Sequence, residues 1–223
     1  MRRTILILIS LFALASASLA HKRNFTYTYD WFTADLFERE IELWWTQREG
    51  GHAEGLIEFE YGVTDRWTVS PYLIFERESG GEMELKGAKL EQRYRFGDFA
   101  VNQVLPAAYF EVKKEDGEEW EIELKAIASY VTPEGITISA NLITEGHPDG
   151  SGPFKWEYAA GIAQPLYPWT LGVELFGDWT NGNHFYGPAI GFSPDAASKV
   201  TVTIGLPSSG GPARVRTLAQ FRF

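Results

Sequence analysis

Charged residues at every second position are the feature of this sequence that bears most directly on chemistry. Glu38, Glu40 and Glu42 alternate in this way, and so do Glu58 and Glu60. In an extended chain alternate side chains lie on one face, so each row projects its charges in a single direction. Such rows either line a polar channel or form a lattice of ion pairs. The charged positions predicted to face one interior are Glu38, Glu40, Glu42, Glu58, Glu60, Lys89, Glu91, Arg93, Arg95, Glu111, Lys113, Glu121, Glu123, Lys125, Glu174, Arg214, Arg216 and Arg222.

Catalytic and metal-binding chemistry has little support in the sequence. His52, His147 and His184 fall in or beside predicted loops, and none has a serine and a carboxylate at a suitable spacing. Cleavage after Ala20 would make His21 the new N-terminus, and its α-amine and imidazole could then hold copper. An incidental histidine is the simpler interpretation. The glutamate rows could attract a hard cation such as calcium, yet straight strands lack the looped geometry of strong calcium sites. We therefore expect no enzyme, no catalytic residue, no metal and no cofactor.

The elements that position these charges are predicted to be β-strands. From Leu36 onward the chain alternates with a period of two and is broken by turn residues, without helical periodicity. This pattern predicts an all-β fold, a closed antiparallel up-and-down transmembrane β-barrel of about twelve strands. An even strand number leaves both termini on the periplasmic side. The predicted strands are 36–47, 54–63, 66–77, 85–96, 104–113, 119–131, 136–145, 155–165, 169–180, 184–193, 199–207 and 213–223.

The opposite face of each predicted strand is apolar, and its aromatic residues fall mainly at strand ends. Amphipathic rings at two heights are what a bilayer selects, whereas the interior of a soluble sandwich or barrel, the alternative, has no need for them. The aromatic girdle is predicted to consist of Trp45, Trp67, Trp120, Tyr130, Trp156, Trp169 and Trp179.

The N-terminus predicts export. Arg2 and Arg3 precede a short apolar run and small residues, which is typical of a signal peptide over residues 1–20 that is cleaved after Ala20. Residues 21–35 are predicted to be an N-terminal periplasmic segment that either enters or caps the barrel mouth or extends the first strand. The barrel is predicted to be one domain, 36–223. The full sequence has no cysteine and a formal net charge of −10, so neither a disulfide framework nor a nucleic-acid partner is expected.

Three segments carry a family resemblance. The stretch 41–48, the hairpin 58–67 and the terminal residues 219–223 resemble a widespread, poorly characterised group of transporter-like bacterial outer-membrane β-barrels. The resemblance implies location in the outer membrane of a Gram-negative envelope, with outer-membrane lipids as partners. Phe221 and Phe223 resemble the C-terminal signal read by the barrel-assembly machinery, which would be the partner during biogenesis.

Two functions remain open from the sequence. A charged wall faces a wall of small neutral residues, so long side chains either leave a slot or reach across and fill the lumen. The first case predicts a narrow, charge-lined passive channel for small polar or charged solutes. The second predicts a non-conducting barrel with a salt-bridged lumen that binds a lipid or partner or supports the envelope. At the closing seam, Arg214 and Arg216 are expected to pair with Glu40 and Glu42.

Overall fold

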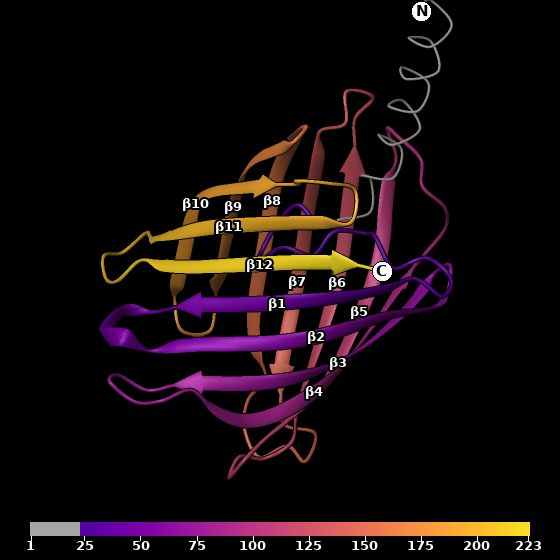
Figure 1. Cartoon of the computed structure of the whole chain (residues 1–223). Coiled ribbons are helices and arrows are strands. Elements are labelled where there is room, and N and C mark those ends of the chain that lie inside the picture. Colours follow the sequence, from indigo (N-terminus) through magenta and orange to yellow (C-terminus); the bar gives the residue numbers. More distant parts are fainter. Residues whose placement is uncertain (1–22) are drawn as a thin grey trace, which may run out of the picture.

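The computed structural model describes residues 23–223, which form a closed barrel of twelve antiparallel strands (Figure 1). The predicted signal peptide and His21 lie outside the described residues. A short 3-10 helix, η2 (Glu49–Gly51), connects the first two strands. The strands are β1 (Arg39–Gln47), β2 (Ala53–Thr64), β3 (Trp67–Arg77), β4 (Glu84–Arg95), β5 (Val104–Glu115), β6 (Glu121–Val131), β7 (Thr137–Gly146), β8 (Lys155–Leu166), β9 (Trp169–Asp178), β10 (Asn183–Phe192), β11 (Ser198–Pro207) and β12 (Arg214–Arg222).

Every strand pairs with its neighbours in the chain, and β1 closes the barrel by pairing with β12. Closure removes the free edges that lipid cannot hydrogen-bond. The predicted fold class is therefore confirmed. β1 begins three residues later than expected because the chain turns at Asp35–Glu38, where the Glu38 amide donates to the Asp35 carbonyl and Phe37 adopts a positive φ of 64°.

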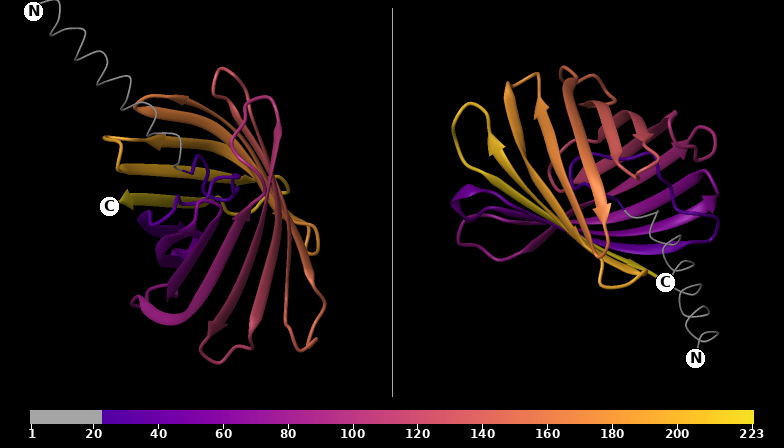
Figure 2. Two further views of the ribbon diagram at one scale, coloured as in Figure 1. Left: turned by 90° about the vertical axis from the view of Figure 1, so that its right-hand side faces the viewer. Right: turned by 90° about the horizontal axis from the view of Figure 1, so that it is seen from above.

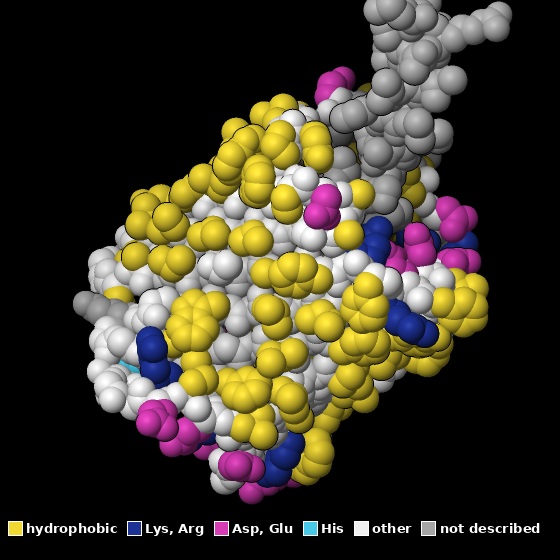
Figure 3. Space-filling view, viewed as in Figure 1, with side chains coloured by type: hydrophobic (Ala, Val, Ile, Leu, Met, Phe, Trp, Pro, Cys, Tyr) yellow, Lys and Arg dark blue, Asp and Glu magenta, His cyan; other side chains and the backbone are white. Residues whose placement is uncertain are grey.

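The alternation in the sequence becomes two different faces of one sheet. In β5 the side chains of Leu105, Tyr109 and Glu111 are buried inside, while Val104 and Phe110 are exposed outside. The outer surface is covered with hydrophobic side chains, and charged ones gather towards the strand ends (Figure 3). A soluble barrel would bury its apolar face, so this arrangement is that of a barrel that crosses a membrane with its strands.

The predicted girdle residues all lie on the outer face. One end of the barrel, which we call the loop end, is formed by connections 48–52, 78–83, 116–120, 147–154, 179–182 and 208–213. Near it lie Trp45, Trp120, Trp156 and Trp179. Trp67, Tyr130 and Trp169 lie near the terminal end, where β1 begins and β12 finishes. Among the described residues, no helix has the length and apolarity to cross a bilayer.

Residues 23–35 run inside the barrel and form no strand (Figure 2). Phe25 and Trp31 are completely buried, and Tyr29 retains 6% of its surface. We call residues 23–35 the inner segment. Its burial means that the lumen contains part of the chain as well as the side chains of the wall.

The orientation of the faces predicts how arginine is tolerated. Leu142 faces outward near the middle of β7, so Leu142→Arg should destabilise the barrel by about 2–4 kcal/mol. Leu206 faces outward near the loop end of β11, and the same change there should cost about 0–1 kcal/mol. Urea unfolding in lipid vesicles measures both. Equal costs at the two positions would contradict the assignment of the apolar belt.

Candidate functional site

The inner segment crosses the lumen and is held by side chains of the wall. The Glu174 carboxylate on β9 accepts the backbone N–H groups of Thr26 at 3.1 Å, Tyr27 at 2.9 Å and Thr28 at 2.7 Å. Thr203 donates its hydroxyl to the same carboxylate at 2.5 Å. Hydrogen bonds to an ionised acceptor are about twice as strong as neutral ones. Glu174 therefore replaces the strand partner that this part of the segment lacks.

Further polar wall residues serve the second half of the inner segment. The Asn141 side chain accepts from the Tyr29 amide at 2.6 Å and donates to the Tyr29 carbonyl at 2.8 Å. Ser129 accepts the amide of Trp31 at 2.9 Å, and Thr68 accepts the amide of Ala34 at 2.8 Å. The backbone of the segment is thus hydrogen-bonded to β3, β6, β7 and β9.

The small wall residues make room for the inner segment. A Cβ atom built on Gly161 would lie 2.5 Å from the Phe25 ring, which no real side chain tolerates. Tyr27 stacks on Phe176 with ring centroids 3.6 Å apart. The contrast between a charged wall and a wall of small residues was visible in the sequence, and residues 21–35 were predicted to enter or cap the barrel mouth or to extend the first strand. The described part of this range enters the lumen, but its contacts with the small wall residues were not predicted.

A buried group of opposite charges lies against the start of the inner segment. Arg23 donates to Glu42 at 3.1 Å, and its guanidinium lies 3.6 Å from the Tyr29 ring centroid. Glu42 faces Glu58 across β1 and β2, and Trp44 donates its indole N–H to Glu58 at 3.0 Å. For the buried Arg23 guanidinium, the cation–π and charge-assisted contacts replace the hydration that it would have in water.

Two clusters of three carboxylates in this region lie close enough together to hold a metal ion. One consists of Glu40, Glu42 and Glu60 and the other of Glu58, Glu60 and Glu91, and in each the potential ligand atoms lie within 4.8 Å of one another. Arg93 pairs with Glu60 and, at 2.7 Å, with Glu91, while Arg23 pairs with Glu42. Arginines therefore already contact both groups.

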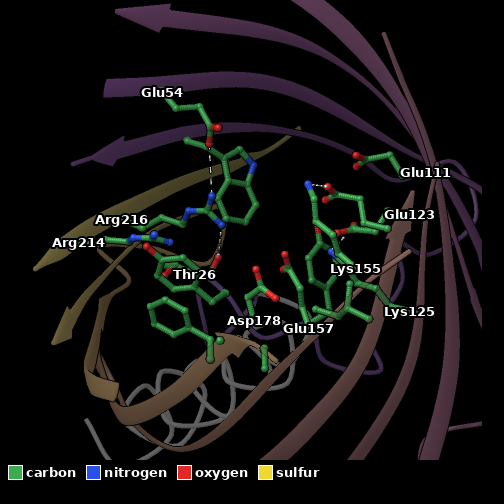
Figure 4. A pocket seen from close by; sticks show the side chains of 18 of the residues that line it. Thr26, Glu54, Glu111, Glu123, Lys125, Lys155, Glu157, Asp178, Arg214 and Arg216 are labelled. Carbon is green, nitrogen blue, oxygen red and sulfur yellow. Dashed lines mark hydrogen bonds and ion pairs between the residues drawn. The ribbon is translucent and has the colours of Figure 1, made fainter. Parts of the chain in front are cut away.

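A cavity of about 650 Å³ lies between the inner segment and the loop end (Figure 4). Thr26, Tyr27 and Tyr29 form part of its floor. Seven basic and seven acidic side chains line it, so its formal charge is balanced. They are Arg48, Lys89, Lys113, Lys125, Lys155, Arg214 and Arg216, and Glu54, Glu111, Glu115, Glu123, Glu145, Glu157 and Asp178.

Most charges in the cavity belong to ion pairs within the wall. Lys89 pairs with Glu111 at 2.8 Å and Lys125 with Glu123 at 2.8 Å. The other pairs are Lys113 with Glu115 and Glu121, Lys155 with Glu145, and both Arg48 and Arg216 with Glu54. Paired charges satisfy the wall and leave little net field in the cavity.

Below the cavity, acidic and basic side chains are no longer equal in number. Among the described residues, the buried charged side chains that do not line the cavity comprise seven acidic and four basic ones. They are Asp30, Glu40, Glu42, Glu58, Glu60, Glu91 and Glu174, and Arg23, Arg93, Arg95 and Lys199. The part of the lumen around the inner segment is therefore acidic, because the inner segment brings in Arg23 but also Asp30.

The closing seam differs from the expected pairing. Glu42 lies opposite Gln220 and Glu40 opposite Arg222, so the pairing of Arg214 and Arg216 with these glutamates was wrong. Gln220 donates to both glutamates at 2.7 Å. The alternation fixes which face a residue occupies, but sliding the strand by an even number of residues leaves the faces unchanged.

At the seam, Arg216 instead bonds Thr46 at 2.9 Å and pairs with Glu54 at 3.4 Å. Arg222 pairs with Glu38 and lies 3.8 Å from Glu40. The remaining predicted interior charges also lie on the lumen side of their strands, where Arg95 is 4.8 Å from the Trp31 ring centroid.

Several residues of the site were missing from the sequence prediction. Arg23 and Asn141 hold or belong to the inner segment, and Glu54, Glu157 and Asp178 line the cavity. Glu54 and Glu157 follow the same alternation as the predicted charges and could have been found by extending it to the strand ends. Phe221 and Phe223 are exposed on the outside, and their role as an assembly signal stays a prediction.

Comparisons with known proteins support the fold. No family model and no curated protein matches this sequence. The structure is similar to the KdgM porin in complex with disordered oligogalacturonate, with a TM-score of 0.64 and 13% identity over 82% of this chain and 99% of the other.

Two further similar structures come from named bacteria. The COG4313 outer membrane channel from Pseudomonas putida F1 has a TM-score of 0.64 and 12% identity, covering 89% of this chain and 100% of the other. The outer membrane protein Omp33 from Acinetobacter baumannii has a TM-score of 0.56 and 8% identity, covering 84% and 98%. The chain thus has the fold of the bacterial outer-membrane β-barrels, and its outer surface suits that membrane.

The seam can be tested by double-mutant cycles. Arg222→Ala and Glu38→Ala should be coupled by about 0.5–1 kcal/mol, because the two side chains form an ion pair that is mostly shielded from solvent. Arg216→Ala and Glu42→Ala should be additive within about 0.5 kcal/mol, since the register separates them by four residues along the strands. Urea unfolding in detergent micelles measures both cycles. Coupling in the second cycle alone would overturn the register.

Anchoring of the inner segment can be tested with a single introduced thiol, since the chain has no cysteine. Thr28 is 1% exposed, so Thr28→Cys should react slowly with a maleimide. Adding Glu174→Ala removes the acceptor of three backbone N–H groups and should raise the labelling rate at least about tenfold. Ser209→Cys in an exposed turn should label rapidly in both backgrounds. An unchanged rate at Thr28→Cys would show that Glu174 does not hold the segment.

Proposed function

We propose that this protein is a narrow, passive outer-membrane channel for small polar or charged solutes, constricted by its own inner segment. The observation that carries the proposal is the charged cavity of about 650 Å³ that ends at this segment. A cavity of this size accommodates a small solute. The fold shared with a porin and an outer-membrane channel supports the same general function.

The predicted signal peptide agrees with an outer-membrane location. We propose that it is cleaved after Ala20 and that the barrel-assembly machinery inserts the barrel. The loop end would face the exterior and the terminal end the periplasm, as in other barrels with even strand numbers. A solute would then meet the balanced cavity first and the acidic constriction second. No enzymatic activity is proposed, because His52 contacts Glu78, His147 contacts the Trp120 carbonyl and His184 contacts the Tyr158 hydroxyl, and none of these contacts includes a serine.

A second candidate is a closed barrel that binds a ligand without conducting it. The complete burial of Phe25 and Trp31 favours this alternative, because the inner segment fills the lumen where it crosses. On the terminal side, the cavity next to Arg23 and Phe32 measures only about 10 Å³. The two functions differ in whether the inner segment yields to a solute or ions.

Planar-bilayer recordings separate the two candidates. The wild-type barrel should give small single-channel steps, and Glu174→Ala should enlarge them at least about twofold, because the inner segment loses its acceptor for three amides. Glu145→Ala is the matched control, since Glu145 lines the cavity but pairs with Lys155 and not with the segment. Folded protein without steps in both the wild type and Glu174→Ala would favour the closed barrel.

The same recordings test the acidic constriction. Glu42→Gln combined with Glu58→Gln removes two facing charges but keeps an oxygen that accepts from Arg23 or Trp44. The cation preference measured from the reversal potential in a salt gradient should fall. Glu115→Gln, near the loop end, should change it much less. An unchanged preference would mean that ions do not pass these glutamates.

A further inference from the structure

Two opposite charges in the cavity are left without a partner. Among the described residues, neither Arg214 nor Glu157 has a hydrogen bond or an ion pair, whereas every other basic side chain of the cavity is paired with a wall carboxylate. Asp178 accepts instead from the amides of Thr180 and Asn181 and so caps the adjacent turn. The ion-pair lattice of the wall therefore explains all the basic residues of the cavity but Arg214.

The two unpaired groups occupy different parts of the same wall. Glu157 lies on β8 and Arg214 on β12, which are separated by β9, β10 and β11. Phe176 and Phe185 stack between them with centroids 5.3 Å apart, and the Arg214 guanidinium lies 4.3 Å from the Phe185 centroid. Tyr27 of the inner segment covers the other face of Phe176 and both phenylalanines are buried, so the rings separate the two charges without forming a free aromatic surface. Figure 4 shows Arg214 and Glu157 within one cavity.

Both groups are partly withdrawn from water, which makes the lack of a partner costly. The two charges are opposite, but no ion pair joins them, and Phe176 and Phe185 lie on strands between them. A simple anion would satisfy Arg214 and leave Glu157 unpaired, and a simple cation would do the reverse. A molecule that carries both charges satisfies the two groups at once and preserves the neutrality of the cavity.

The spacing indicates the length of that molecule. Four strand intervals of about 4.8 Å separate β8 from β12 along the wall, and the two long side chains shorten the gap. The ammonium and carboxylate of a single amino acid are too close together to bridge two charges with a ring between them. An extended peptide of two or three residues spans about 7–10 Å.

We propose that the cavity binds short peptides with free termini, the carboxylate at Arg214 and the ammonium at Glu157. This inference rests on the proposed function, because it names the class of solute that the channel admits. Recognition of both termini excludes blocked peptides.

Titration calorimetry with trialanine tests the site on the folded full-length barrel in detergent. The free peptide should bind, and acetylation of its N-terminus or amidation of its C-terminus should each weaken binding about tenfold, since each removes one charge-assisted contact. Arg214→Gln and Glu157→Gln should each do the same. Blocking a peptide terminus and mutating the side chain that binds it remove the same contact, so the two losses of affinity should not add. Glu157→Gln should therefore not weaken binding of the acetylated peptide further, and Arg214→Gln should not weaken binding of the amidated peptide further.

Arg48→Gln and Glu115→Gln are the matched controls, because both residues line the cavity but belong to wall ion pairs. Each should change the affinity for trialanine less than about twofold. Equal weakening by the controls, equal binding of the blocked peptides, or no binding of trialanine by the wild type would each overturn the proposal.

Bilayer recordings with trialanine distinguish a failure of this site from a failure of the channel. Peptide binding without single-channel steps would support the site and overturn the conducting function. Single-channel steps that the peptide does not block, together with no binding in calorimetry, would support the channel and overturn the peptide site.

Discussion

A backbone N–H or C=O group that is withdrawn from water must find a hydrogen-bond partner, and this constraint governs both layers of the structure. In the wall it is met by pairing every strand with two neighbours, which requires β1 to close on β12. In the lumen it is met by side chains, since the inner segment lies beside the sheet without joining it. Glu174 and Asn141 hydrogen-bond the amides that a neighbouring strand would otherwise serve.

The inner segment also divides the lumen into two electrostatic regions. Above it, basic and acidic side chains are equal in number and mostly paired, so the cavity is polar without a strong field of one sign. Around it, buried carboxylates outnumber basic side chains, and Arg23 and Arg93 sit among them. Long charged side chains and the inner segment thus occupy much of the space that twelve strands enclose, while specificity is left to the few groups that the wall does not neutralise.

The fold was predictable because its signal is local. Alternation assigns each residue to a face, and the aromatic residues at strand ends indicate the bilayer, so the strands, closure and outer face followed from the sequence. Register was not predictable, since Arg216 meets Thr46 and Glu54 rather than Glu42, and both registers place the arginine inside. Entry of residues 21–35 into the barrel mouth was one of the predicted alternatives, but the depth and the contacts of the inner segment were not predictable, for a related reason. Tyr29 and Asn141 are 112 residues apart, and no local pattern joins them.

The distances in sequence that the inner segment bridges also set an order of events during assembly. Its anchors on β6, β7 and β9 are synthesised after it, and the contact between Thr26 and Glu174 spans 148 residues. Contacts of such separation form only after the intervening chain has been organised. The segment can therefore be gripped only once much of the wall exists. Before that moment the inner segment would not yet occupy the lumen, so we expect its insertion to be a late step of assembly.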